Sequence, residues 1–393
     1  MKLLIYSHFF APSIGGVETI VLSLARGLAE VRNEKGLAEF DVTLATQTPA
    51  GSHNDSSLPF RVFRGPRLVK LLELVRESDV VHVAGPALAP LLLSYILRKP
   101  LIVEHHGYQA TCPNGLLFHH PSGAVCRGQF EARNYLECLT CNSKTDGTIG
   151  SLRLLISTFA RRALSRHANA NIAPSHHVAA RQNLPRTKVI FHGVEDPFTG
   201  KGMLPKRTSN AKGFAYLGRL VVEKGVSVLL EATRLLRAEG REVHVVLIGD
   251  GPQRPELETQ IRQNGLASCA RITGYLTGAP LLEALRDASV VVMPSVWEET
   301  AGLAAIEQMM RGRLVIASKT GGLAELVDDA SLTFPAGDSQ ALAQSMQKVL
   351  QDPSIIESLG QKARERALRY FRRERMVEDH VRLYRQALEG GDQ

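Results

Sequence analysis

Two glutamates flank the start of a predicted helix in the C-terminal half of the chain. Residues 289–293 (SVVVM) form a short apolar run typical of a buried parallel strand, and Pro294 ends it. Apolar residues at helical spacing then predict a helix that begins near Gly302. Glu299 lies just before this helix and Glu307 lies in its second turn. The backbone N–H groups at a helix start can bind a phosphate, and the carboxylates can accept hydrogen bonds from sugar hydroxyls.

Simpler interpretations of these carboxylates exist. Glu299 could stabilise the helix dipole, and Glu307 could be a solvated helix residue. A pair of glutamates also suggests the acid and base of a glycoside hydrolase. Two cations favour the role of donor ligands instead, because Arg219 and Lys224 are five residues apart across a turn after a predicted strand. Together they can contact one diphosphate, although either alone is more often an ordinary surface cation.

The elements that must position these residues belong to an α/β protein. A chain of 393 residues exceeds the size at which one hydrophobic core usually stops growing, so we expect two domains. Apolar runs that alternate with helical segments predict two doubly wound parallel sheets. The predicted first domain covers residues 1–195, the linker residues 196–212, and the second domain residues 213–370. A C-terminal helix within residues 371–393 is long enough to cross back to the first domain.

Two positions in the first domain could contribute to a site. Gly15 and Gly16 form a turn at the carboxyl end of the first predicted strand, which is the side where open α/β sheets bind ligands. The simpler interpretation is a plain tight turn. His106 ends the apolar run LIVEHHG, where a histidine is more often a packed, hydrogen-bonded residue.

Several separated motifs resemble those of the family 4 retaining glycosyltransferases, which have the GT-B architecture. They are PSIGGVE at 12–18, HGVE at 192–195, GRL followed by KG at 218–225, the two glutamates with seven residues between them, and GG followed by Glu325 at 321–325. The resemblance covers nearly the whole chain. It implies two Rossmann-like domains that face each other across a cleft.

The resemblance also implies an activity and roles for residues. The expected reaction is hexosyl transfer from a nucleotide diphosphate sugar to the hydroxyl of a glycan, lipid-linked or small-molecule acceptor, with retention at the anomeric carbon, as in polysaccharide biosynthesis. His106 would contact the sugar or acceptor, Glu299 the sugar hydroxyls and Glu307 the ribose. The expected catalytic residues are His106, Arg219, Lys224 and Glu299. The expected substrate-binding residues are Gly15, Gly16, Arg219, Lys224, Glu299, Thr300, Ala301, Gly302, Leu303 and Glu307.

The chain departs from the family pattern at Ala301, where an aromatic residue often precedes the glycine, and at His192, which replaces the usual asparagine. No DxD sequence occurs, so we expect catalysis without a metal, with cations and the helix start stabilising the leaving group. The alternatives are a sugar-nucleotide epimerase or hydrolase of the same fold, or a catalytically silent scaffold of a polysaccharide assembly system. A dinucleotide oxidoreductase is disfavoured, because neither glycine loop has GxGxxG spacing.

Four of the five cysteines lie in a predicted irregular insert over residues 107–150. Cys112, Cys126, Cys138 and Cys141 could form a structural zinc site, although only the last two have close zinc-ribbon spacing. Reduced thiols and an iron–sulfur centre remain alternatives. Cys269 is expected to be a small buried hydrophobe.

The net charge of +8 is unevenly distributed. Residues 1–195 hold 21 Lys+Arg against 14 Asp+Glu, which leaves 26 against 25 for the remainder. Such a bias can indicate nucleic acid, an anionic membrane or an acidic substrate. We expect no nucleic-acid partner and keep peripheral membrane contact as an alternative, because residues 153–167 predict a basic amphipathic helix. Packing on its own domain is the simpler interpretation of that helix. The N-terminus lacks the features of a secretory signal, so we expect a cytoplasmic protein.

Overall fold

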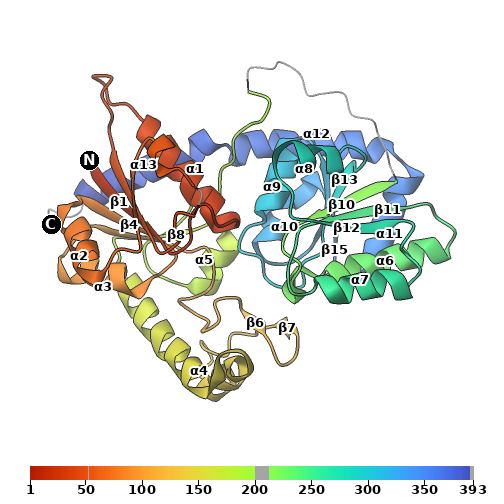
Figure 1. Cartoon of the computed structure of the whole chain (residues 1–393), viewed down its shortest axis with the longest axis horizontal. Helices are drawn as coiled ribbons and strands as arrows, with labels where there is room; N and C mark the ends of the chain where they lie inside the picture. The colour runs from red at the N-terminus through yellow and green to blue at the C-terminus, as the bar shows by residue number, and fades with distance from the viewer. Residues whose placement is uncertain (52, 200–211, 390–393) are drawn as a thin grey trace. The chain divides into compact units, whose positions relative to one another are not determined.

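The computed structural model describes residues 1–51, 53–199 and 212–389 (Figure 1). The chain forms two compact units. Unit 1 comprises Met1–Pro121, Cys126–Glu195 and Arg372–Gln393, and unit 2 comprises Ser122–Val125 and Asp196–Phe371. Most of the predicted linker lies outside the described residues.

Unit 1 is built on a seven-stranded parallel sheet with the order β3-β2-β1-β4-β5-β8-β9. The strands are β1 (Lys2–Ser7), β2 (Asp41–Thr46), β3 (Arg61–Arg64), β4 (Val80–Ala84), β5 (Leu101–Glu104), β8 (Ala170–Ala173) and β9 (Thr187–Val189). The helices are α1 (Gly16–Glu30), α2 (Leu68–Glu77), α3 (Leu88–Ile96), α4 (Tyr135–His167), α5 (His176–Gln182) and α13 (Arg373–Glu389), with a short 3-10 turn η1 (Asp55–Ser57).

Strand alternation gives the two faces of this sheet different partners. Val81 and Val83 of β4, with Leu101 and Val103 of β5, share one core with the inner sides of α2 and α3 and with Leu164 of α4. The intervening residues of these strands point to the other face, as the period of two requires. There His82 of β4 meets α13, which also packs on α1. The cluster around Glu104 described below lies on this second face.

Unit 2 is built on a six-stranded parallel sheet with the order β12-β11-β10-β13-β14-β15. The strands are β10 (Gly213–Leu217), β11 (His244–Ile248), β12 (Ala270–Gly274), β13 (Val290–Met293), β14 (Leu314–Ser318) and β15 (Leu332–Phe334). The helices are α6 (Val226–Ala238), α7 (Arg254–Gln263), α8 (Gly278–Ala284), α9 (Leu303–Met310), α10 (Gly321–Val327), α11 (Ser339–Gln351) and α12 (Ser354–Tyr370), with the 3-10 turns η2 (Val222–Lys224) and η3 (Asp328–Ala330). The two predicted doubly wound sheets are confirmed.

The insert is more regular than the sequence predicted. It contains the short strands β6 (Phe118–His119) and β7 (Ala124–Val125), and helix α4 begins at Tyr135 rather than near Arg153. The helix is interrupted at Gly147, whose φ of 68° and ψ of 173° only glycine adopts easily. The first part is polar and shows no clear apolar period, which is why the expectation of an irregular segment up to residue 150 was wrong.

The last helix returns to unit 1. The backbone N–H of Arg373 donates to Val194 O at 3.0 Å, which joins the start of α13 to the HGVE turn. A side chain at Gly193 would place its Cβ 2.6 Å from Arg372 O, so this close approach requires glycine. The predicted crossover helix is therefore confirmed. Among the described residues, no helix is both long and apolar enough to cross a bilayer.

Candidate functional site

Three loops of unit 2 meet beyond the carboxyl ends of β10, β13 and β14, which are neighbouring strands. The loop after β10 joins the loop after β13, because Val296 N donates to Glu223 O at 3.0 Å. The turn that starts α10 joins the same loop, because Gly322 N donates to Glu299 O at 2.6 Å. The structure therefore brings together three motifs that are separated in the sequence.

Lys224 and Glu299 form an enclosed ion pair in this site. Lys224 Nζ donates to Glu299 Oε1 at 2.7 Å, and the two side chains are only 17% and 6% exposed. Ser295 Oγ donates to the same oxygen. The ammonium also lies 5.5 Å from the centre of the Trp297 ring, within the range of a cation–π contact. The sequence pointed to Lys224 and Glu299 but did not predict their direct contact, nor the roles of Ser295 and Trp297.

Arg219 has a different environment from Lys224. Its side chain is 63% exposed, and its guanidinium lies 3.8 Å from Glu223 in a loose ion pair. The Arg219 backbone is fixed, because the buried Tyr216 hydroxyl donates to Arg219 O at 2.7 Å. The site therefore has one enclosed cation, Lys224, and one exposed cation, Arg219. The planar guanidinium of Arg219 can still change its orientation to contact a ligand.

The start of α9 has the features expected of a phosphate-binding helix end. Gly302 is its N-cap and no side chain caps the first turn, while Thr300 and Ala301 are buried. A Cβ at position 302 would lie 2.7 Å from Leu323 Cδ1, so the glycine also relieves packing against α10. The close approach of a diphosphate to Gly302 stays a prediction. The backbone N–H groups from Leu303 onward remain the phosphate-binding candidates.

Glu307 is half-buried in α9. Burial raises the pKa of its carboxyl, and the positive charge of Arg311 opposes this shift. The Glu307 charge in turn adds to the effect of burial in raising the pKa of Tyr275, so these two side chains are electrostatic neighbours. Tyr275 is half exposed and follows β12, and the sequence gave no reason to expect it beside Glu307.

The GG turn positions Glu299. Gly321 has a φ of 55°, and a Cβ there would lie 2.5 Å from Glu299 O. Both the left-handed backbone and the close approach therefore require glycine. This contact explains why the GG motif accompanies the glutamate pair.

In unit 1, Gly15 is the N-cap of α1 and Gly16 is its first residue. A side chain at Gly15 would collide with the carboxylate of Glu18, which accepts a hydrogen bond from Ser13 Oγ at 3.1 Å. The PSIGGVE motif is therefore a closed loop whose polar groups contact one another.

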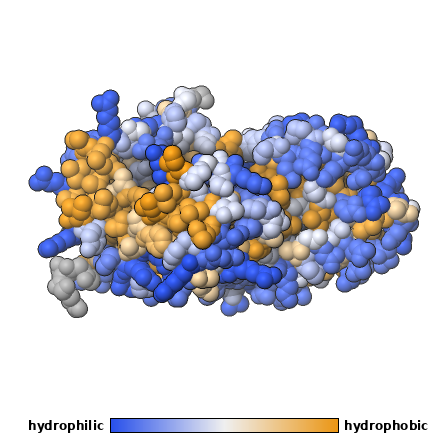
Figure 2. Space-filling model, turned by 90° about the horizontal axis from the view of Figure 1, so that it is seen from below, coloured by the Kyte–Doolittle hydropathy of each residue, from blue (hydrophilic) through white to orange (hydrophobic). Residues whose placement is uncertain are grey.

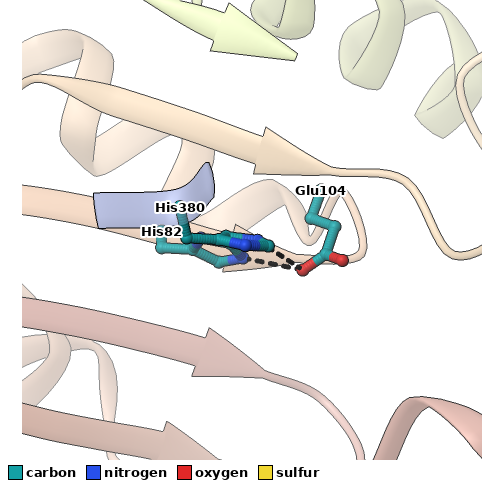
Figure 3. Close-up of side chains that lie close together, drawn as sticks. All are labelled: His82, Glu104 and His380. Atoms are coloured by element: carbon teal, nitrogen blue, oxygen red, sulfur yellow. Dashed lines mark hydrogen bonds and ion pairs between the residues drawn. The ribbon is translucent and has the colours of Figure 1, made fainter. Parts of the chain in front are cut away.

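A second cluster of unit 1 surrounds Glu104, at the end of β5. Its carboxylate is fully buried, and four imidazoles point their Nε2 atoms at it. The distances are 3.1 Å for His82, 3.6 Å for His106, 3.7 Å for His192 and 3.9 Å for His380. Figure 3 shows His82 and His380 side by side, with their ring edges toward Glu104.

Of these four histidines, only His82 is within hydrogen-bond distance of Glu104, and the other three imidazoles lie slightly farther away. His82 Nδ1 is 2.8 Å from the Tyr384 hydroxyl, so both of its nitrogens have partners, and His380 Nδ1 is 2.8 Å from Met376 O. Burial opposes ionisation of Glu104, but the charge of His106, the nearby His192 and the hydrogen bond from His82 hold its pKa well below the usual range. Burial lowers the pKa of His106 and of His380 to about 4, despite the Glu104 charge.

This cluster distinguishes the adjacent residues His105 and His106, and it includes His192. His105 is turned away, with Nε2 2.9 Å from Asn171 Oδ1, so His106 is the residue that faces Glu104. The His106 side chain is almost entirely enclosed, so its role in contacting the sugar stays a prediction. His192 replaces the usual asparagine and reaches the same carboxylate. A polar residue within the apolar run VVHVA was the signal that could have identified His82.

The four cysteines of the insert gather in unit 1. Cys112, Cys138 and Cys141 are buried, and Cys126 is partly buried. Asn114 joins two of them, because Cys112 Sγ donates to Asn114 Oδ1 at 3.0 Å and Asn114 Nδ2 donates to Cys141 Sγ at 3.7 Å. Among the described residues, the sets of three ligand atoms within 4.8 Å of one another are both built on Glu104, and the cysteines form no such set. The fifth, Cys269, is buried as expected.

Two Rossmann-like units, with an enclosed Lys–Glu pair beside an uncapped helix start, define the GT-B class of fold and site. Comparison with known proteins agrees. A family model described as "Glycosyl transferases group 1" matches residues 211–352. Glycogen synthase of Mycobacterium tuberculosis is 30% identical over 318 residues, which cover 77% of this chain and 67% of that protein. The chain therefore belongs to the group 1 glycosyltransferase family.

Other relatives match over shorter parts. Alpha-D-kanosaminyltransferase of Streptomyces kanamyceticus is 32% identical over 150 residues, which are 38% of this chain and 39% of that protein. The chain thus matches less than half the length of this relative. HepE of Anabaena in complex with UDP has a TM-score of 0.72 at 18% identity, covering 98% of this chain and 100% of that chain. HepE with UDP-glucose gives 0.69 at 20% identity, covering 99% of each. At these identities the likeness shows the fold.

Proposed function

We propose that this protein transfers a hexosyl group from a nucleotide diphosphate sugar to an acceptor hydroxyl, with retention of anomeric configuration. The observation that carries the proposal is the enclosed Lys224–Glu299 pair beside the uncapped start of α9. The group 1 family and the HepE complexes with UDP and UDP-glucose support a nucleotide-sugar donor. Retention follows from the resemblance to family 4.

The proposed mechanism is stabilisation of the departing diphosphate. An ammonium has three N–H donors, so Lys224 can keep its bond to Glu299 and still donate to a phosphate oxygen. Arg219 is open and can add a bidentate contact. The N–H groups at the start of α9 add a partial positive charge. These groups lie where negative charge would develop on the leaving diphosphate. Electrostatic stabilisation of such charge in the transition state is the largest contribution to the rates of many enzymes.

The glutamates have separate roles in this proposal. Glu299 is already held by Lys224 and Ser295, so its second oxygen is oriented to accept hydrogen bonds from sugar hydroxyls. Glu307 lies in the second turn of α9, beside Tyr275, and would accept from the ribose. Because burial raises the pKa of Glu307, a hydrogen-bonded ribose is a better partner for it than a second anion would be.

We propose that this chemistry needs no metal ion. The support is the lack of a DxD sequence, together with two cations and a helix start in the place where a metal would otherwise neutralise the diphosphate. In unit 1, His106, Gly15 and Gly16 would act on the transferred sugar or acceptor, which rests on the resemblance.

We also propose a structural Zn²⁺ bound by Cys112, Cys126, Cys138 and Cys141. Four thiols are a preferred zinc ligand set. Burial, with smaller contributions from the charges of Cys112, Cys126 and Cys141, raises the pKa of Cys138 to about 12, so the four thiols lie near one another. A divalent ion would supply the positive charge that buried thiolates need.

The proposed location is the cytoplasm, with peripheral contact at the inner face of a membrane. The excess of cations in residues 1–195 supports an anionic surface or a lipid-linked acceptor.

A ligand screen tests the proposed function. Thermal unfolding is measured with a panel of nucleotide diphosphate sugars and with the matching free sugars. A donor that binds the folded state raises the unfolding temperature by mass action. We expect at least one nucleotide sugar to raise it and the free sugar alone to have no effect. If no nucleotide sugar or nucleoside diphosphate stabilises the protein, the proposal is wrong.

A further inference from the structure

Large apolar side chains are exposed on one side of unit 1. Of the seventeen such side chains among the described residues, eleven lie on α2, α3 and α4. We call these eleven the apolar face: Leu68, Val69, Leu72, Leu92, Tyr95, Ile96, Leu136, Ile149, Leu152, Ile156 and Phe159. Figure 2 shows large orange areas over unit 1, whereas most of the visible surface of unit 2 is blue.

The exposed residues of α4 follow helical spacing. Ile149, Leu152, Ile156 and Phe159 are separated by three, four and three residues, and they are 70%, 48%, 59% and 43% exposed. Over the same stretch the buried residues of α4 are Ser151, Leu155 and Thr158. Phe159, at the edge of the exposed set, also contacts the rings of Phe130 and Tyr135 within unit 1. A helix that only packs on its own domain needs one apolar stripe. Ile149, Leu152 and Ile156 instead form an apolar stripe on the exposed side of α4, which is available for a partner.

Helices α2 and α3 extend the same surface. Helix α3 lies against both α2 and α4, and the three helices share one core under the sheet. Leu91 of α3 is buried in that core, while Leu92, Tyr95 and Ile96 are exposed. The exposed stripes thus belong to one side of the unit and exceed the scattered apolar residues of an ordinary surface.

The charge on this side is positive. Residues 147–167 contain four arginines and no aspartate or glutamate. Arg67, Arg76, Arg98, Arg153 and Arg166, on or next to the same three helices, are exposed and form no ion pair with any described residue. The exposed apolar side chains could insert between the headgroups and acyl chains of a lipid surface. The arginines beside them could contact the phosphates of anionic lipids.

We propose that the apolar face docks on an anionic lipid bilayer, with the side chains of α2, α3 and α4 inserted at the headgroup level and the arginines on lipid phosphates. This inference rests on the membrane contact in the proposed function, but it can be tested apart from glycosyl transfer, because binding requires no donor. It deepens the proposed function by favouring a lipid-linked acceptor, which would be presented at the same surface.

Co-sedimentation with vesicles tests the docking. The full chain is mixed with vesicles of phosphatidylcholine alone or with added phosphatidylglycerol. We expect affinity for the anionic vesicles to be at least about tenfold higher and to fall with added salt, because exposed charges are screened. Arg153→Gln with Arg166→Gln should reduce this preference for anionic lipid.

Replacing apolar residues of the apolar face by glutamate distinguishes specific docking from non-specific binding to vesicles. Ile96→Glu with Ile156→Glu should lower affinity for the anionic vesicles by about tenfold or more, since both residues are exposed and the fold does not depend on them. Leu282→Glu is the control, because Leu282 is also exposed but lies on α8 of unit 2. It should leave binding unchanged, and all variants should keep the wild-type unfolding temperature.

Three results would overturn the proposal. The first is no binding of the wild type to anionic vesicles. The second is an equal loss of binding in Leu282→Glu. The third is a wild-type dimer in light scattering that Ile156→Glu separates, which would identify the apolar face as a contact between copies of this chain. None of these results depends on whether a nucleotide sugar binds.

Discussion

Lys224 Nζ lies 2.7 Å from Glu299 Oε1, although the two residues are 75 positions apart in the chain. The loop after β10 carries the lysine and the loop after β13 carries the glutamate, and these strands are hydrogen-bonded neighbours. Removing one partner of an enclosed ion pair leaves the other charge uncompensated. The pair is therefore both a candidate part of the donor site and a structural link between two loops.

Replacement of Lys224 separates these two roles. Lys224→Met should lower donor turnover by about a hundredfold, as expected when one stabilising group for a leaving anion is lost. The control is Lys212→Met, which removes an exposed ion pair with Glu242 in the same unit. The control should keep turnover, because exposed pairs contribute about 1 kcal/mol or less.

The measurement is initial rate against donor concentration, with the free energy of unfolding determined for each variant. Normal turnover in Lys224→Met would contradict the assignment of the lysine to the diphosphate. Equal losses in both variants would indicate that the effect is not specific to the site.

A glycine substitution tests the support of Glu299. Gly321→Ala should weaken donor binding, because the Cβ would lie 2.5 Å from Glu299 O and displace the loop. Gly240→Ala is the control, since Gly240 has a similar left-handed φ of 74° and open space around it. Both changes should cost about 1 kcal/mol of stability through the backbone conformation. Only Gly321→Ala should also raise the donor Kd, which calorimetric titration with a nucleotide sugar would measure; an unchanged Kd would refute the support role.

The glycosyltransferase motifs could be recognised in the sequence because each one is a short run of neighbouring residues. The apolar runs, glycine turns and cations after strands predicted both sheets and selected Lys224 and Glu299. The contact between them could not be predicted, because it depends on the order of strands in the sheet. The contact between Gly302 and Leu323 likewise could not be predicted, since it depends on the position of α10.

The cluster around Glu104 shows a second limit of sequence reasoning. Four separate segments of the chain contribute its histidines, which are His82, His106, His192 and His380. They meet because β4 and β5 turn alternate residues toward one face of the sheet, and α13 returns to that face. The sequence analysis missed the polar first part of α4 for a local reason. This segment lacks the periodic apolar residues on which helix prediction depends.

The buried histidines predict a pH dependence of stability. The pKa of His105 and of His380 is lowered by burial to about 4 from the usual 6.5. Between these values the unfolded chain binds protons that the folded chain does not, so the free energy of unfolding should fall as pH decreases from about 6.5 to about 4. Each histidine adds a slope of about 1.4 kcal/mol per pH unit. Protonation of Glu104, whose folded pKa is also lowered, should cost stability only at still lower pH.

Denaturant titrations across this range measure the slope. His380→Gln should reduce the slope by about one proton, because it removes one buried imidazole. His244→Gln, which changes an exposed imidazole in unit 2, serves as the control. An unchanged slope in His380→Gln would mean that this histidine is not the buried neutral group described above.

Metal analysis tests the cysteine insert. The purified protein should contain about one zinc ion per chain, and Cys138→Ser with Cys141→Ser should lose it. Cys269→Ser, a change of the one cysteine outside the insert, should retain the metal. Treatment with a strong chelator should lower the unfolding temperature of the wild type but not of the double variant. Iron with visible absorbance in place of zinc, or no metal at all, would refute a zinc site.

Turnover of a nucleotide sugar by the wild type and by Glu299→Ala and Lys224→Ala tests the central claim most directly. The wild type is incubated with the donor identified by the thermal screen, with and without candidate acceptors, and the released nucleoside diphosphate and the anomeric configuration of the product are measured. We predict release by the wild type, a product of retained configuration, and a loss of about a hundredfold in both variants. Wild-type turnover in both variants would contradict the account.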